Sequence, residues 1–239
     1  MILVNNISKS YKSLFGKTSN EFNILNDISF KIDKGDIIGI VGHNGSGKTT
    51  LLKILFNLIN EDSGNIFLNE SKDDYKEFIK KKASLINNNE RSFFWRLSVA
   101  SNIDFFNSLL NNPSSKKNIQ EKVDFLDINH LMEKKFGTLS SGEKTKVLLL
   151  RGLIKNPDLI FFDEIMGSLD VQSKNIVMQY IKKINNDGVT IVWVTHSLDE
   201  IDTLCNRFII MKNGCIYSKE NINEILSAPS EFIYRVLSE

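Results

Sequence analysis

A glycine-rich segment in the first quarter of the chain, residues 42–50, reads Gly-His-Asn-Gly-Ser-Gly-Lys-Thr-Thr. It lies between an apolar run, residues 36–41, and a helix-patterned run, residues 51–59. Glycine adopts backbone angles that are closed to other residues, so successive N–H groups in such a turn can point at one anion. The N-terminus of the following helix adds a partial positive charge. The segment therefore predicts a strand, turn and helix that wrap a polyphosphate.

The residue types inside this turn have separate expected roles. Lys48 is expected to reach the β- and γ-phosphates, and the hydroxyl of Thr49 is expected to bind Mg²⁺. Glycine-rich turns before helices also occur for structural reasons, but the strand before and the helix after favour the phosphate interpretation. The other expected cofactor-binding residues of the turn are Gly42, His43, Asn44, Gly45, Ser46, Gly47 and Thr50.

Composition limits the class of protein. The chain has 239 residues, 41% of them hydrophobic and 25% charged, which suits one large or two small globular domains. Its formal net charge of +1 gives no general attraction to nucleic acid, so no nucleic-acid partner is expected, and the basic run at residues 80–82 is expected to be a solvated helix face. Neither a membrane-spanning apolar run nor a secretory signal is recognisable, so a cytoplasmic chain is expected. Cys205 and Cys215 lack metal-site spacing and are expected to be buried small hydrophobes.

Short apolar runs alternate with amphipathic runs, which predicts an α/β protein with a largely parallel sheet. Segments with few helical signals around them predict antiparallel strands at residues 2–7, 24–32 and 65–68. Core strands are expected at residues 84–86, 159–162 and 189–194, and a closing hairpin at 208–211 and 215–217 around Asn213-Gly214.

The stretch from residue 97 to residue 156 contains no convincing strand pattern. It predicts helices at residues 99–110, 119–126 and 143–155, with Pro113 and Gly137 as breaks. The expected organisation is one domain, residues 1–239. It has a mixed β core, an N-terminal antiparallel β subdomain and an inserted α-helical subdomain at roughly residues 90–156.

A second candidate site follows the apolar run at residues 159–162, which ends in Asp163 and Glu164. Because adjacent strand residues point to opposite sides, the two acids are expected to have different roles. Asp163 suits a Mg²⁺ ligand, and Glu164 suits a general base that polarises a water for in-line attack. Two acids that merely end a strand are the alternative, which the nearby phosphate turn makes less attractive.

Two further candidate sites lie at the ends of predicted elements, one at the start of a helix and one after a strand. Residues 139–143, Leu-Ser-Ser-Gly-Glu, lead into a helical pattern, so Ser140, Ser141 and Gly142 form either an ordinary helix cap or a second anion-binding helix N-terminus. A chain with two such helix ends suggests that each nucleotide is held by pieces of two subunits. His196 follows a strand on the side where open α/β sheets bind ligands, and it is expected to contact the γ-phosphate or the attacking water.

In this order the motifs resemble those of the ATP-binding subunit of ATP-binding-cassette (ABC) transporters, over essentially the whole chain. Residues 42–49 match Walker A, residues 139–143 the LSGGQ signature, residues 159–163 with Glu164 Walker B and its catalytic glutamate, residues 168–170 the D-loop, and His196 the switch histidine. The resemblance implies a P-loop ATPase fold of the ABC type, ATP and Mg²⁺ as cofactors, and a nucleotide-dependent head-to-tail dimer. It also implies an integral membrane permease as partner at the cytoplasmic face of the membrane, and it makes Tyr11 the aromatic that stacks on adenine, unless Tyr11 is a core residue.

This sequence departs from the family pattern at several positions. Ser141 replaces a glycine and Glu143 a glutamine, although backbone N–H donors survive both changes. The glutamine that links Mg²⁺ to the membrane partner has no clear counterpart among residues 87–89. Counting from the preceding strand favours Asn88, and counting back from Leu97 favours Asn89, which we take as the expected metal-site residue.

The segment at residues 90–97 contains Phe93-Phe94-Trp95, which suits either a groove for the permease or core packing. It resembles sequences of ABC-2 type exporter subunits that move polysaccharides and lipid-linked glycans, as does the stretch at residues 12–22. The sequence therefore predicts a peripheral ATP hydrolase that powers a separately encoded exporter. A cassette ATPase acting on DNA or ribosomes, or a regulatory cassette, are the alternatives. Cassette ATPases that act on DNA carry a long coiled-coil insertion and those that act on ribosomes carry a second cassette, and this chain has neither feature.

Overall fold

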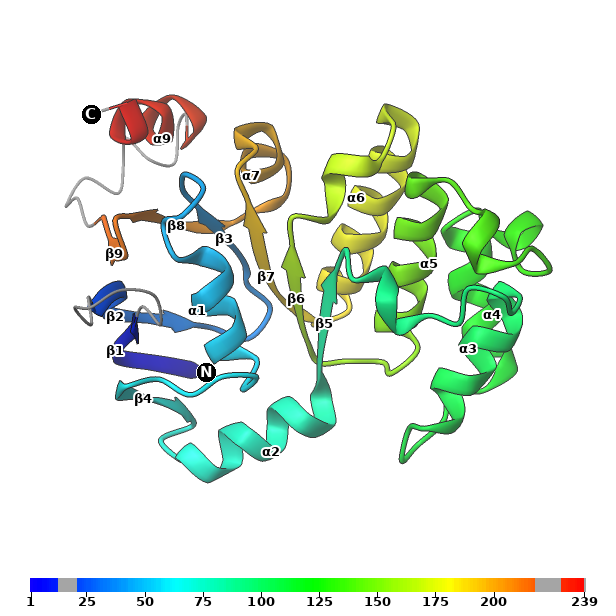
Figure 1. Cartoon of the computed structure of the whole chain (residues 1–239), viewed down its shortest axis with the longest axis horizontal. Coiled ribbons are helices and arrows are strands. Elements are labelled where there is room, and N and C mark those ends of the chain that lie inside the picture. The colour runs from blue at the N-terminus through cyan, green and yellow to red at the C-terminus, as the bar shows by residue number, and fades with distance from the viewer. Residues whose placement is uncertain (13–20, 218–228, 239) are drawn as a thin grey trace. The chain divides into compact units, whose positions relative to one another are not determined.

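The computed structural model describes residues 1–12, 21–217 and 229–238 of the chain. It divides into two compact units (Figure 1). The first unit contains Met1–Lys81 together with Thr190–Glu239, and the second contains Lys82–Val189. The phosphate turn lies in the first unit and the acidic pair lies in the second.

An antiparallel sheet opens the first unit, as the sequence predicts. Strand β1 lies between β2 and β4, with Ile2 opposite Ile32 on one side and Leu68 on the other. Apolar residues such as Val4 and Ile7 face the core and are fully buried, which explains the pairing. The strands extend further than predicted, and most of the stretch at residues 12–22 lies outside the described residues. The bounds are β1 Ile2–Lys12, β2 Glu21–Ile32 and β4 Ser63–Leu68.

The second sheet of the first unit carries the phosphate turn. Strand β3 pairs in parallel with β7 on one side and β8 on the other, and all five β3 residues are buried. Strand β9 pairs antiparallel with β8 through the predicted hairpin, where Asn213 and Gly214 have φ values of 51° and 77°. This mixed sheet confirms the expected fold class. The bounds are β3 Ile37–Val41, β7 Thr190–Thr195, β8 Arg207–Lys212 and β9 Cys215–Ile216.

Helices α1, α7 and α9 belong to this unit, and α2 runs up to its boundary. Helix α1 ends earlier than the helical pattern at residues 51–59 predicts, because Asn57 has a φ of 56°. Helix α2 was not predicted as an element, although its exposed lysines at residues 80–82 form the expected solvated face. The bounds are α1 Lys48–Leu55, α2 Lys72–Lys82, α7 Leu198–Leu204 and α9 Pro229–Ser238.

The second unit has two parallel strands and four α-helices, drawn in green to yellow in Figure 1. Among its described residues, the stretch from 97 to 156 contains helices and no strand element. Ser98, Ser115 and Asp170 accept a backbone N–H at the starts of α3, α4 and α6, which fixes where those helices begin. The bounds are β5 Ala83–Asn87, α3 Val99–Ser108, α4 Lys116–Phe125, α5 Ser141–Leu153, β6 Leu159–Asp163 and α6 Val171–Asn186.

None of the helices in the described part of the chain combines the length and the apolar character that a membrane crossing requires. Cys205 and Cys215 are unbridged. Both were expected to be buried and are only partly buried, and burial raises the pKa of the Cys205 thiol to about 12.

Candidate functional site

The turn after β3 folds around the side chain of Lys48. Its ammonium donates hydrogen bonds to the carbonyl oxygens of Gly42, at 2.7 Å, and His43, at 3.1 Å, and the residue is only 5% exposed. Gly45 and Gly47 have φ values of 84° and 100°, where a side chain would strain the backbone. The sequence therefore closes a tight loop whose interior carries a positive charge at the start of α1.

Ser46 supplies an independent sign that this loop receives a ligand. Its hydroxyl is buried, and its Oγ has no hydrogen-bond partner among the described residues. A buried hydroxyl without a partner loses free energy, so native structures seldom leave one unexplained. A phosphate oxygen would accept from it, so the loop fits the polyphosphate that the sequence predicts. Thr49 is exposed at the second residue of α1, where its hydroxyl can reach a cation.

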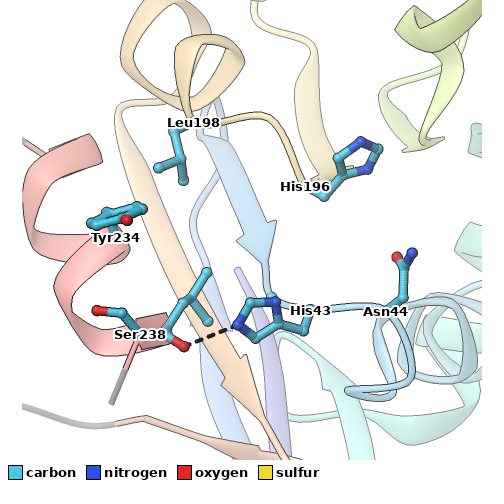
Figure 2. Close-up of a pocket in the computed structure, with 8 residues that line it drawn as sticks. His43, Asn44, His196, Leu198, Tyr234 and Ser238 are labelled. Carbon is cyan, nitrogen blue, oxygen red and sulfur yellow. Dashed lines mark hydrogen bonds between the residues drawn. The ribbon is translucent and has the colours of Figure 1, made fainter.

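His196 lies in the same unit as this loop and close to it. It follows the last residue of β7 and is exposed. Figure 2 shows His196 and Asn44 on one side of a pocket of about 370 Å³, with Tyr234 and Leu198 on the other. The structure therefore places His196 and residues of the phosphate loop around one cavity, and the contact of His196 with the γ-phosphate or the attacking water stays a prediction.

The C-terminal helix, α9, contacts this loop, which was not predicted from the sequence. The imidazole Nε2 of His43 lies 3.0 Å from the carbonyl oxygen of Leu237 in α9. Ile233 and Val236 of the same helix are buried against the cluster that includes Val41, the last residue of β3. The helix and its contact with His43 were not predicted, because the contact depends on long-range packing that no local pattern contains.

In the second unit, Asp163 is the last residue of β6 and Glu164 lies beyond the strand. Glu164 has φ 50° and ψ 43°, the left-handed region, and both acids are half-buried. Strand alternation therefore ends at Asp163 and does not by itself set the direction of the Glu164 side chain, and the different roles expected for the two acids stay a prediction. The left-handed conformation is uncommon for a non-glycine residue and often marks a functional position.

The asparagines at the end of β5 and just after it have different pairing partners. Asn87 pairs in register with Asp163, and the side-chain amide of Asn88 donates to the carbonyl oxygen of Glu164 at 3.2 Å. The side chain of Asn89 instead accepts the N–H of Arg91, at the start of a 3₁₀ helix, Glu90–Ser92. The geometry therefore favours Asn88 over Asn89 as the asparagine that contacts the acidic pair, through the backbone of Glu164.

The turn at residues 140–142 begins α5 through a capping box. The Ser140 hydroxyl accepts the Glu143 N–H at 3.3 Å, and the Glu143 carboxylate accepts the Ser140 N–H at 2.8 Å. That second bond holds the pKa of Glu143 below its ordinary value. Ser141 has no positive φ, so a side chain at this position is unstrained. The helix-cap interpretation is thus present, and it leaves the N–H groups of Ser141 and Gly142 as first-turn donors.

The aromatic segment splits into a core residue and two surface residues. Phe93 is 4% exposed and stacks on Phe136 with ring centroids 4.2 Å apart, so of the two alternatives for this segment core packing holds for Phe93. Phe94 and Trp95 are 47% and 48% exposed. Tyr11, in β1, is 47% exposed and is not a core residue.

Comparison with known proteins identifies the family. A family model described as "ABC transporter" matches residues 25–167, which include the phosphate loop, residues 139–143 and the acidic pair. The chain belongs to the ABC transporter family. The chain is an ATP-binding cassette of this family. This confirms the expected enzyme class, an ATP hydrolase, and the expected cofactors, ATP and Mg²⁺.

Individual relatives agree with this assignment. The cassette is 31% identical to the methionine import ATP-binding protein MetN 1 of Enterococcus faecalis, over 97% of the chain and 66% of that relative's length. It is 32% identical to the energy-coupling factor transporter ATP-binding protein EcfA1 of Mycoplasmopsis synoviae, over 99% of the chain and 92% of that protein. Among solved structures, the ATP-binding cassette MJ0796, a dimer in a post-hydrolysis state bound to ADP and Pi, superposes with a TM-score of 0.79 at 25% identity. That match covers 92% of this chain and 98% of the other.

Proposed function

We propose that this cassette binds MgATP, hydrolyses it and powers a separately encoded membrane permease. The observation that carries the proposal is the phosphate loop, in which the Lys48 ammonium is held inside the turn and the Ser46 hydroxyl is buried without a partner. Lys48 would bind the β- and γ-phosphates as a cation, and Ser46 with the backbone N–H groups of the glycine-rich turn would hydrogen-bond their oxygens.

Each unit offers oxygen atoms of the kind that Mg²⁺ prefers. The first unit offers the hydroxyl of Thr49, and the second offers the carboxylate of Asp163 and the amide oxygen of Asn88. When bound, the ion neutralises charge that develops on the phosphates. Exposed Tyr11 offers its ring as a surface on which a base can stack.

Glu164 is our candidate for the general base. Its carboxylate would take a proton from a water as that water attacks the γ-phosphorus, and the bond to the β–γ bridging oxygen breaks to release ADP and phosphate. The left-handed backbone at Glu164 ends the extended course of β6, so Glu164 is the first residue beyond the strand. His196 would contact the terminal phosphate or the water, since it lines the cavity beside the loop.

A second copy of the chain would complete each nucleotide site. The N–H groups of Ser141 and Gly142 lie at the N-terminus of a helix of 13 residues, which attracts an anion. Ser140 is hydrogen-bonded to Glu143, so it would hold the turn in place while the N–H groups of Ser141 and Gly142 donate to the phosphate. In a head-to-tail dimer this turn would meet the γ-phosphate held by the partner's phosphate loop.

The permease would dock on Phe94 and Trp95, which are half exposed beside the Asn-rich segment. Exposed aromatic side chains of this size are typical anchors of protein interfaces. This docking would place the cassette at the cytoplasmic face of the membrane as a peripheral subunit.

Two transport directions are supported by different observations. Residues 90–97 resemble segments of exporters of polysaccharides or lipid-linked glycans, which favours export. The relative from Enterococcus faecalis is named a methionine import protein, which favours import. Proteoliposomes with cassettes facing outward separate the two, because export fills the lumen with added glycan when MgATP is present, whereas import empties a lumen loaded with methionine.

The test of nucleotide binding is the Lys48→Ala variant, with Lys53→Ala in the same helix as control. We expect Lys48→Ala to lose ATP affinity by about tenfold or more, because it removes a charge-assisted contact. ATP affinity equal to that of the unmodified chain would overturn the assignment of the phosphate loop.

A further inference from the structure

Lys144 lies at the start of α5 and reaches a different segment of the second unit. Its ammonium is 2.9 Å from the carboxylate of Glu90 and 4.4 Å from the ring centroid of Trp95. The Lys144 side chain is only 13% exposed, although lysine is among the residues most often found in water. A largely buried cation that contacts both a carboxylate and an aromatic face is restrained by both contacts.

A second cation on the same helix holds the same segment. Arg151, seven residues after Lys144 and so two turns along α5, donates to the hydroxyl of Ser92 and lies 4.3 Å from the ring centroid of Phe106. Burial lowers the pKa of the Arg151 guanidinium. Residues 90–95 are therefore fastened to one face of α5 at two places, and they cannot shift along that face without breaking charged contacts.

The neighbouring side chain at the start of α5 faces the turn. Glu143 closes the capping box with Ser140, while the backbone N–H of Lys144 donates to the Ser140 carbonyl at 2.9 Å. Ser140 is thus tied to both residues. Hydrogen bonds therefore connect the turn at 140–142 to the backbone that carries Lys144.

We propose that Lys144 is a positioning residue that couples the turn at residues 140–142 to the exposed aromatic pair, Phe94 and Trp95. Nucleotide bound at the turn shifts the start of α5, and Lys144 carries that shift to Glu90 and Trp95, where the permease contacts the cassette. The same link runs in reverse, because coupling between two sites is reciprocal. This inference rests on the proposed nucleotide dimer and docking surface.

The tryptophans of this chain provide a direct probe of the coupling. There are two, Trp95 at 48% exposure and Trp193 at 1%. Acrylamide in solution therefore quenches Trp95 and leaves Trp193 as a constant background. We would measure the quenching with and without MgATP in the full chain carrying Glu164→Gln, and follow dimer formation in the same samples by sedimentation.

The variants separate coupling from packing. Lys144→Met keeps an unbranched side chain in place and removes the charge, Lys144→Arg keeps the charge, and Glu90→Gln removes the ion pair alone. Lys146→Met, two residues on in the same helix, is the matched control. We expect MgATP to change the quenching of Trp95 in the parent, in Lys144→Arg and in Lys146→Met, and Lys144→Met to lose about fivefold or more of that change although the dimer forms. Glu90→Gln should fall between these limits.

The inference is overturned if the Lys144→Met dimer shows the full change of the parent, or if the parent dimer forms and Trp95 does not respond. A parent chain that forms no dimer with MgATP would contradict the proposed function instead, so the two failures are told apart by the sedimentation result.

Discussion

Truncating Phe93 should destabilise the isolated cassette far more than truncating Trp95, although the two are only two residues apart. Phe93 is 4% exposed, stacks on Phe136 and meets Phe106 edge-on with ring centroids 5.1 Å apart. Trp95 is 48% exposed, and one face of its ring carries the ammonium of Lys144. The two variants therefore remove different amounts of buried contact.

The magnitudes follow from burial. A buried Phe→Ala change typically costs ~3–5 kcal/mol of unfolding free energy. For a chain of this size each kcal/mol lowers Tm by about 2–4 °C, so Phe93→Ala should lower Tm by about 6–20 °C. Trp95 loses a partial packing contact and a cation–π contact of ~0.5–1 kcal/mol, so Trp95→Ala should lower Tm by only a few degrees.

The assay is thermal unfolding of both variants followed by circular dichroism, together with co-purification of each folded variant with the permease. We expect Trp95→Ala to remain folded and to lose the permease, with Phe94→Ala behaving in the same way. Equal Tm losses for Phe93→Ala and Trp95→Ala would refute the division of this segment into core and surface. A less stable Trp95→Ala that still binds the permease would refute the docking role.

Three further variants test particular contacts. Gly152→Ala should destabilise the chain and lower its Tm, because an added Cβ would overlap the buried side chain of Ile86. The pKa of Glu143 is lowered in the folded state, so its cap stabilises the chain above the ordinary glutamate pKa and loses that effect as the pH falls through the folded-state value. In urea melts, the unfolding free energy of Glu143→Gln should therefore fall less between neutral and acidic pH than that of the unmodified chain. Asn88→Ala should reduce ATP turnover more than Asn89→Ala in a steady-state phosphate-release assay, and equal effects would reject the preference for Asn88.

The strands and the phosphate loop could be predicted because their signals are local. The apolar run before Gly42, the glycines within the turn and the helical pattern after it lie in one short stretch, and each has a physical consequence for the backbone. The hairpin at Asn213-Gly214 was predictable for the same reason, since both residues tolerate a positive φ.

Other features depend on contacts that no local pattern contains. Asn88 and Asn89 are the same residue type in the same loop, and only the partner of each side chain separates them. Phe93 and Trp95 are both large and aromatic, so the sequence could not show that one meets Phe136 and the other faces outward. The left-handed backbone of Glu164 was also hidden, because a glutamate rarely adopts it and the apolar run before it suggests that the strand continues.

The central claim is that Glu164 acts as the base in an ATP-hydrolysing dimer, and the Glu164→Gln variant tests it most directly. Glutamine keeps the size of the side chain and cannot take the proton, so phosphate release should fall by about 10²-fold or more while MgATP affinity is unchanged. Sedimentation with MgATP should then show a persistent dimer. Phosphate release near that of the unmodified chain, with no dimer, would contradict the account.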